Sequence, residues 1–139
     1  MSTREDIVSH LVKLLKAMNS PKLGKVVRDP IVVDELPKTA FPAVYVETTN
    51  EDIEDVTMQK LRRGVIDVEV VVIVGGKSRD TQRNVVVEGI EKALMADRTV
   101  GDNAKDISLA RVEAVAVGES APYASLRMVF NVEHHYTIT

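Results

Sequence analysis

The sequence contains no cysteine, and aromatic residues make up only 4% of its 139 positions. Without cysteine the chain has no disulfide bond, no thiolate metal site and no cysteine nucleophile, while the redox compartment stays open. Few aromatic rings are present on which unpaired bases could stack. The net charge of -3 also gives the whole surface no attraction for nucleic acid or anionic membranes.

Long apolar runs are missing too, and no stretch approaches the roughly 20 residues that cross a bilayer. The first ten residues, MSTREDIVSH, are polar and mixed in charge, which is not typical of a signal peptide. Repeats, low-complexity tracts and linkers are absent as well. With 45% hydrophobic and 28% charged residues, the composition predicts one soluble cytosolic domain spanning residues 1–139.

Nucleotide-binding signatures are also lacking, although VVIVGGKSRD (residues 71–80) resembles a phosphate loop at first sight. Such a loop needs a glycine at each end of its spacer, so that backbone amides curl around the phosphates. Here Val71 stands where the first glycine belongs, and the β-branched run to Val74 favours extended backbone. We therefore interpret the segment as a strand that turns into a helix capped by Ser78 or Asp80. No dinucleotide fingerprint or nucleophile elbow is present, so the sequence gives no support for an enzyme and implies no cofactor.

Two segments show helical spacing of apolar residues. The first begins after a possible N-cap at Thr3 and ends before Pro21, and the second begins at Ser78 and is broken by ADRTVGDNAKD (residues 96–106). The apolar stripes consist of Ile7, Leu11, Leu14, Leu15 and Met18 in the first segment, and Val86, Val87, Ile90, Ala93 and Leu94 in the second.

Extended patterns are expected at residues 43–47, 61–74, 107–117 and 126–138, with short strands at 26–27 and 31–33. In the 61–74 segment one face is wholly apolar. The other face is expected to be solvent-exposed at Asp67 and Glu69 and buried at Val71 and Ile73. GESAPYA (residues 118–124) is a turn, so the last two strands should pair antiparallel.

These elements predict an α+β fold, with a mainly antiparallel sheet of about four strands and two helices packed on it. The strands are longer than usual, which indicates β-hairpin extensions that find burial against a neighbouring subunit.

Histidine and acidic clusters are the remaining candidates for chemistry. His134 and His135 are adjacent on a strand and point to opposite faces, so they cannot easily coordinate the same metal ion. His134 shares a face with Val132 and Tyr136, and we expect it at the partly solvent-exposed end of that face. We interpret both histidines as ordinary sheet residues, and His10 is too remote in sequence to be placed.

The polar segment TTNEDIEDV (residues 48–56) carries four carboxylates and is predicted to be an exposed loop. Its spacing matches no calcium loop, since the required glycine and terminal glutamate are missing. A solvated loop that can dock onto a basic partner is the favoured interpretation over a cation site or an acid–base pair. Lys60, Arg62 and Arg63 follow directly, so a long hairpin would bring opposite charges together within one subunit or between neighbours. This basic patch is too small to indicate nucleic-acid binding.

The order of segments resembles the tail terminator, or tail completion, proteins of long-tailed bacteriophages. The resemblance rests on VVDELPKTAFPAVYVET, RRGVIDVEVVVIV, IEKALMADRTVGDNA and LRMVFNVEHHYTI, and on the phrases P-A-V-Y-V and A-L-x-A-D-R-T within them. It covers nearly the whole chain. It implies an α+β sandwich and a structural, non-enzymatic virion protein of the tail–neck junction, assembled in the bacterial host cytoplasm.

The same resemblance implies a hexameric ring that caps the tail tube, stops its polymerisation and presents its other face to the neck connector. The expected partners are further copies of the chain, the tail tube protein and the connector, and DNA passes through without sequence-specific binding. Another neck or head–tail joining component remains an alternative, as does a small bacterial ligand-binding regulatory domain.

The residues expected at the subunit or tube interface belong to the loop at residues 50–59, the basic patch and a second loop at 97–102. They are Glu51, Asp52, Glu54, Asp55, Lys60, Arg62, Arg63, Asp97 and Arg98.

Overall fold

The computed structural model describes residues 4–19, 21–29, 41–57, 60–75, 79–115 and 123–137, within which it has two helices and five strands. In chain order these elements are α1 (Arg4–Lys16), β1 (Lys25–Val27), β2 (Ala43–Asp55), β3 (Leu61–Gly75), α2 (Arg79–Met95), β4 (Asp106–Val115) and β5 (Tyr123–Thr137). The predicted α+β class is confirmed. Four expectations lie outside the described residues: the cap at Thr3, the cap at Ser78, the strand at 31–33 and most of the turn at 118–124.

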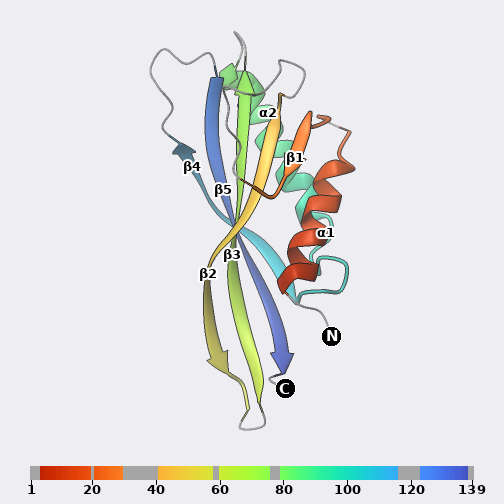
Figure 1. Ribbon diagram of the computed structural model, residues 1–139, viewed down its shortest axis with the longest axis vertical. Coiled ribbons are helices and arrows are strands. Elements are labelled where there is room, and N and C mark those ends of the chain that lie inside the picture. Colours follow the sequence, from red (N-terminus) through yellow and green to blue (C-terminus); the bar gives the residue numbers. More distant parts are fainter. Residues whose placement is uncertain are drawn as a thin grey trace.

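The strands form one sheet in the order β1-β2-β3-β5-β4 (Figure 1). The short strand expected at residues 26–27 is present as β1, and its parallel pairing with β2 brings the count to five strands rather than about four. All other pairs are antiparallel, including β4 with β5, as predicted for the last two strands.

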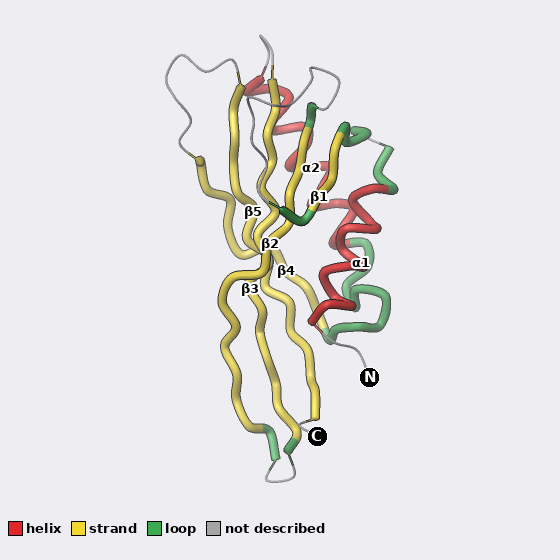
Figure 2. The backbone as a smooth tube through the Cα atoms, viewed as in Figure 1, coloured by secondary structure: helices red, strands yellow, loops and turns green. Residues whose placement is uncertain are grey.

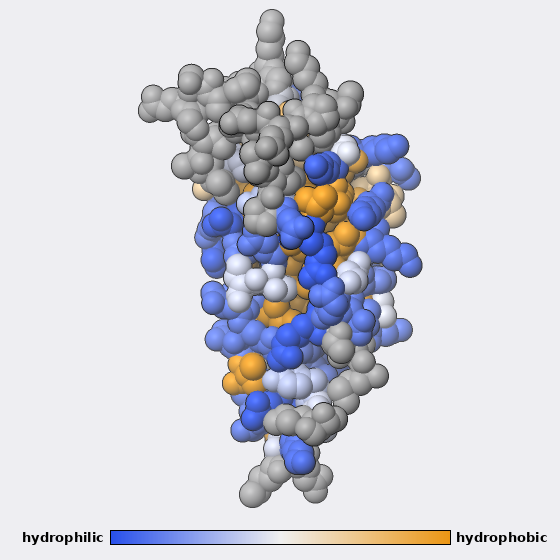
Figure 3. Space-filling view, in the orientation of Figure 1, coloured by the Kyte–Doolittle hydropathy of each residue, from blue (hydrophilic) through white to orange (hydrophobic). Residues whose placement is uncertain are grey.

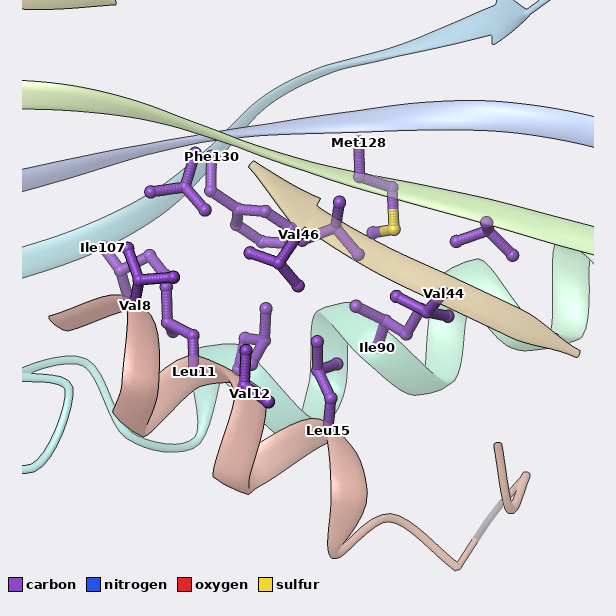
Figure 4. Close-up of a cluster of buried hydrophobic side chains, with 14 of the residues drawn as sticks. Val8, Leu11, Val12, Leu15, Val44, Val46, Ile90, Ile107, Met128 and Phe130 are labelled. Carbon is purple, nitrogen blue, oxygen red and sulfur yellow. The ribbon is translucent and has the colours of Figure 1, made fainter. Parts of the chain in front are cut away.

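Both helices pack on the same face of the sheet, because each has one apolar stripe to bury. In α1 the stripe includes Ile7, Leu11 and Leu15, and in α2 it includes Ile90 and Leu94; all five are fully buried. Figure 4 shows Phe130 pointing from the sheet toward the helices, with Leu11 and Ile90 pointing back toward it. Val68, Val70 and Val72 of β3 complete this core.

The segment at residues 48–56, expected to be a loop, is strand as far as Asp55. The expectation was wrong because it considered burial alone. Opposite β3, this polar segment gains ladder hydrogen bonds and cross-strand ion pairs, which stabilise an exposed strand without a core. A β-bulge lies between Thr48, which pairs with Val68, and Glu51, which pairs with Ile66. The extra residue places Glu51 on the side of the sheet that faces the helices.

Beyond the two helices the sheet continues as a narrow ribbon of three strands (Figures 1 and 2). We call this ribbon the projection, and it comprises residues 51–55 of β2, 61–66 of β3 and 132–137 of β5. Strand β4 begins at Asp106, opposite Glu133, and so runs along the base of the projection only. The long hairpin extension expected from the sequence is therefore present, and it brings the predicted charged residues of β2 and β3 together.

Candidate interaction site

The tip of the projection is the turn between β2 and β3, which is closed by a hydrogen bond from the Val56 amide to the Leu61 carbonyl (2.9 Å). Lys60 adopts a left-handed backbone conformation there, with φ of 73°. Ile53 and Val56 are 48% and 46% exposed, and Figure 3 shows an apolar patch amid hydrophilic surface over the lower part of β2. Exposed apolar side chains at the end of a ribbon are suited to contact with another protein.

Cross-strand ion pairs hold the three strands of the projection together. Arg63 of β3 donates to Glu54 of β2 (3.2 Å) and to Glu133 of β5 (2.9 Å), and so bridges both neighbouring strands. The hydrogen bond from Arg63 lowers the pKa of Glu133 below its ordinary value. On the other face, Arg62 donates to Asp55 (3.0 Å). The opposite charges predicted to meet on a long hairpin do meet, within one subunit.

On the face toward the helices, Glu51 links the projection to α1. Both of its oxygens accept hydrogen bonds from Arg4, which opens α1, and one oxygen lies 3.1 Å from His134 Nε2. The Arg4 guanidinium also sits 4.7 Å from the centre of the Tyr136 ring, which stacks on His134 with centroids 5.1 Å apart. The first turn of α1 is thereby clamped to the base of the projection.

Gly64 makes this clamp possible: it pairs with Ile53 and His134 in the ladder, and its missing side chain leaves room for the Glu51 carboxylate to reach the imidazole of His134. A Cβ at this position would come within 2.3 Å of Glu51 Oε2 and 2.8 Å of His134 Nε2. Burial raises the pKa of Glu51, but the hydrogen bonds from Arg4 and His134 outweigh it and leave the pKa below its ordinary value. The carboxylate therefore stays ionised at neutral pH.

His134 is 2% exposed, so the expectation that it lies at a partly solvent-exposed end of the face was wrong. The alternation of β5 correctly put it on one face with Tyr136 and Val132. Its partner Glu51 could not be predicted from the sequence, because the bulge in β2 turns Glu51 toward His134 and no local pattern indicates that bulge. Arg4 and Glu133 were missed for the same reason: their importance depends on pairing across the fold.

The second predicted contact segment, residues 97–102, folds back on its own subunit. Asp97 accepts hydrogen bonds from the Gly101 amide (3.0 Å) and lies 2.8 Å from His10 Nε2 on α1. The Gly101 amide and then His10 lower the pKa of Asp97. Arg98 makes a two-pronged pair with Asp106 at 2.7 and 2.8 Å. This segment joins α1 to the start of β4.

Among the nine predicted interface residues, Asp52 and Lys60 are exposed and have no ion pair with another described side chain. The other seven pair within the subunit. Within the described ranges, no group of three or more acidic or histidine side chains is arranged to hold a metal ion. None of the described helices has both the length and the apolar character needed to cross a membrane. What the projection offers is a stiff ribbon with an apolar and charged tip, which is suited to binding another protein.

No protein-family model matches the chain, and no curated protein matches its sequence. Its fold does match that of a chain in the structure of the virion of a native gene transfer agent (GTA) particle. The two share 15% sequence identity with a TM-score of 0.50, and the match covers 97% of this chain and 96% of the other. The two chains therefore share one fold over almost their full lengths.

Proposed function

We propose that the protein is a structural component of a phage-like virion, forming a ring that caps the tail tube and joins it to the head–neck connector. The observation that carries this proposal is the full-length fold match to a chain of a GTA virion. The segment order and phrases of the sequence, which resemble tail terminator proteins, support the same role. No arrangement of catalytic groups among the described residues favours an enzyme instead.

Ending a tube requires an asymmetric subunit. A terminator binds the last ring of the tube through one face and lacks a second copy of the tube-binding surface, so head-to-tail addition stops. In this protein the two ends of the sheet differ strongly, since one is covered by helices and the other is the bare projection. The exposed tip at Ile53 and Val56, with Lys60 beside it, is the surface we assign to the tube or a neighbouring subunit.

The lumen of such a ring should let DNA pass without holding it. A net charge of -3 is consistent with that requirement, because an acidic surface does not retain phosphates. Another neck or head–tail joining component would share this fold and this charge. It would differ from a terminator by binding the connector and leaving the growth of the tube unaffected.

A ligand-binding regulatory domain is the alternative from a different class. Three cavities along the described residues have volumes of about 210, 290 and 260 Å³ and open at the surface, whereas pockets for small molecules usually hold about 300–1,000 Å³. A monomer that binds a small molecule saturably would favour this alternative.

The decisive experiment adds the purified protein to its tube subunit during polymerisation. A terminator should shorten the tubes in proportion to its concentration and leave one extra ring at one end in electron micrographs. An equal amount of protein added after polymerisation is the control, since it should cap tubes without shortening them. Tubes of unchanged length with no end ring would refute the terminator role, and binding to the connector alone would support the neck alternative.

A further inference from the structure

The face of the sheet opposite the helices carries a strong excess of acidic side chains. Cross-strand pairing puts eight carboxylates on this face but only three arginines, and we call the region the acidic face. The carboxylates are Glu47, Asp52, Glu54, Asp67, Glu69, Asp106, Glu113 and Glu133, and the arginines are Arg63, Arg111 and Arg127.

The three arginines are already engaged within the subunit. Arg127 lies between Glu69 (2.6 Å) and Glu113 (3.6 Å), Arg111 pairs with Glu113, and Arg63 pairs with Glu54 and Glu133.

Three carboxylates remain without an ion pair to any described side chain. Asp52 is exposed, while Glu47 and Asp67 are half-buried. A hollow of about 210 Å³, lined by Arg63, Asp106 and Glu133 among others, opens on the same face. The apolar stem of a long cationic side chain can lie in such a hollow while its head group reaches the unpaired carboxylates elsewhere on the face.

A strip of lysines lies at the opposite edge of the sheet, along the end of α1 and the start of β1. Between Asp6 and Asp29 the sequence has no acidic residue, and Lys13, Lys16, Lys22 and Lys25 in this interval are all exposed. We call these four residues the lysine strip. Strand β1 and strand β4 form the two edges of the sheet, so the strip and the β4 side of the acidic face lie on opposite flanks.

From this arrangement we infer that the acidic face binds a second copy of this chain, with the lysine strip of one subunit docked on the acidic face of the next. The two surfaces differ in charge and lie on different parts of the subunit. Such a contact is heterologous, which is the kind of interface that closes into a ring when the rotation allows it. Complementary charge would also steer the encounter and fix its direction. The inference rests on the proposed function for the ring itself and adds the surfaces that build it.

Two charge-reversed variants test this pairing. Lys16→Glu with Lys22→Glu cancels the net positive charge of the strip, because Lys13 and Lys25 remain, and Asp52→Lys with Asp67→Lys makes the acidic face less acidic. Each variant alone should assemble at least tenfold more weakly than the wild type in sedimentation at low ionic strength. Circular dichroism should show that both remain folded. The control compares two single variants. Lys92→Glu reverses an exposed charge on α2 outside the strip and should leave assembly unchanged, whereas Lys22→Glu reverses one charge within the strip and should weaken it.

Mixing the two variants provides the sharper result. The lysines introduced on the face of one variant can pair with the glutamates introduced in the strip of the other. The mixture should therefore assemble better than either variant alone, and native mass spectrometry should find both variants in each oligomer. Assembly of either variant at wild-type strength would overturn the inference. It would also fail if the mixture stayed dissociated, if a basic tube subunit alone occupied the acidic face, or if the wild type remained monomeric at every concentration and ionic strength.

The failure of this inference can be told apart from that of the proposed function. Charge-reversed variants that still assemble and cap tubes would refute the pairing and leave the terminator role intact. Oligomers that depend on the pairing but have no effect on tube length would support the pairing and refute the terminator role.

Discussion

The helix-covered half of the sheet and the projection are built from the same strands but are held together by different forces. In β3, Val70 and Val72 are fully buried under the two helices, whereas Arg62 and Arg63, a few residues earlier, keep more than a third of their side chains exposed. Burial of apolar surface stabilises the first region. Ladder hydrogen bonds and cross-strand ion pairs hold the second, and each exposed pair of that kind contributes little by itself. The exposed apolar side chains at the tip of the projection, Ile53 and Val56, are thus free to serve contacts, since they lie outside the hydrophobic core.

The largest effect should come from the core. Phe130→Ala removes the largest side chain buried beneath the helices, and a substitution of this kind costs about 3–5 kcal/mol through lost burial and the cavity left behind. Urea unfolding followed by circular dichroism should show this loss. Phe130→Leu is the matched control and should lose much less, because it refills most of the space. Equal losses for both variants would mean that packing at this position is not what stabilises the covered half.

The next largest effect should come from Gly64, at the junction between the two regions. Gly64→Ala drives a methyl group against Glu51 and His134, and overpacking of this kind costs about 1–3 kcal/mol. Gly75→Ala at the other end of β3 is the control, since its new methyl group would approach Phe41 no closer than 3.3 Å and needs a shift of only a few tenths of an ångström. Adding Glu51→Ala to Gly64→Ala should recover part of the loss. Additive losses would show that the methyl group does not act through Glu51.

The clamp between α1 and the projection should respond to pH. The pKa of Glu51 is lower in the folded state, so its contribution is present above the unfolded pKa of about 4.5 and is lost as pH falls through the folded value. Glu51→Gln should therefore cost about 1–2 kcal/mol at pH 7. Its stability should converge with that of the wild type in the acid range below pH 4.5. Asp52→Asn, at the next position and exposed, should change little; a difference between Glu51→Gln and wild type that stays constant down to acid pH would contradict this account.

The smallest effect on stability should come from the tip. Ile53→Ser with Val56→Ser changes two half-exposed side chains and should shift the unfolding free energy by no more than about 0.5 kcal/mol. Under the proposed function, the same variant should lose most of its effect on tube length. Val85→Ser on α2, which removes an equally exposed apolar group elsewhere, should keep that effect. Tip variants that shorten tubes as well as the wild type does would assign the tube contact to another surface.

The sequence alone predicts the parts of this fold that depend on local periodicity. The apolar stripes containing Leu11 in α1 and Ile90 in α2 are visible in the spacing of apolar residues. The second face of β3, which is partly exposed at one end and buried at the other, follows from the alternation of polar and apolar residues. The strand at residues 48–55 could not be predicted, because its stability comes from pairing with β3 rather than from its own composition. The burial of His134 likewise depends on a partner far away in the sequence, Glu51, which the bulge in β2 turns toward it.

The bulge between Thr48 and Glu51 decides which side chains of β2 point to each face of the projection. Strict alternation would turn Ile53 and Asp55 to the opposite side and exchange them with Asp52 and Glu54. Deleting one residue here would thus invert the pattern of charge along five positions while every amino acid stayed the same. Related chains could therefore acquire a new binding preference through a one-codon insertion or deletion, without altering the helices or the valines beneath them.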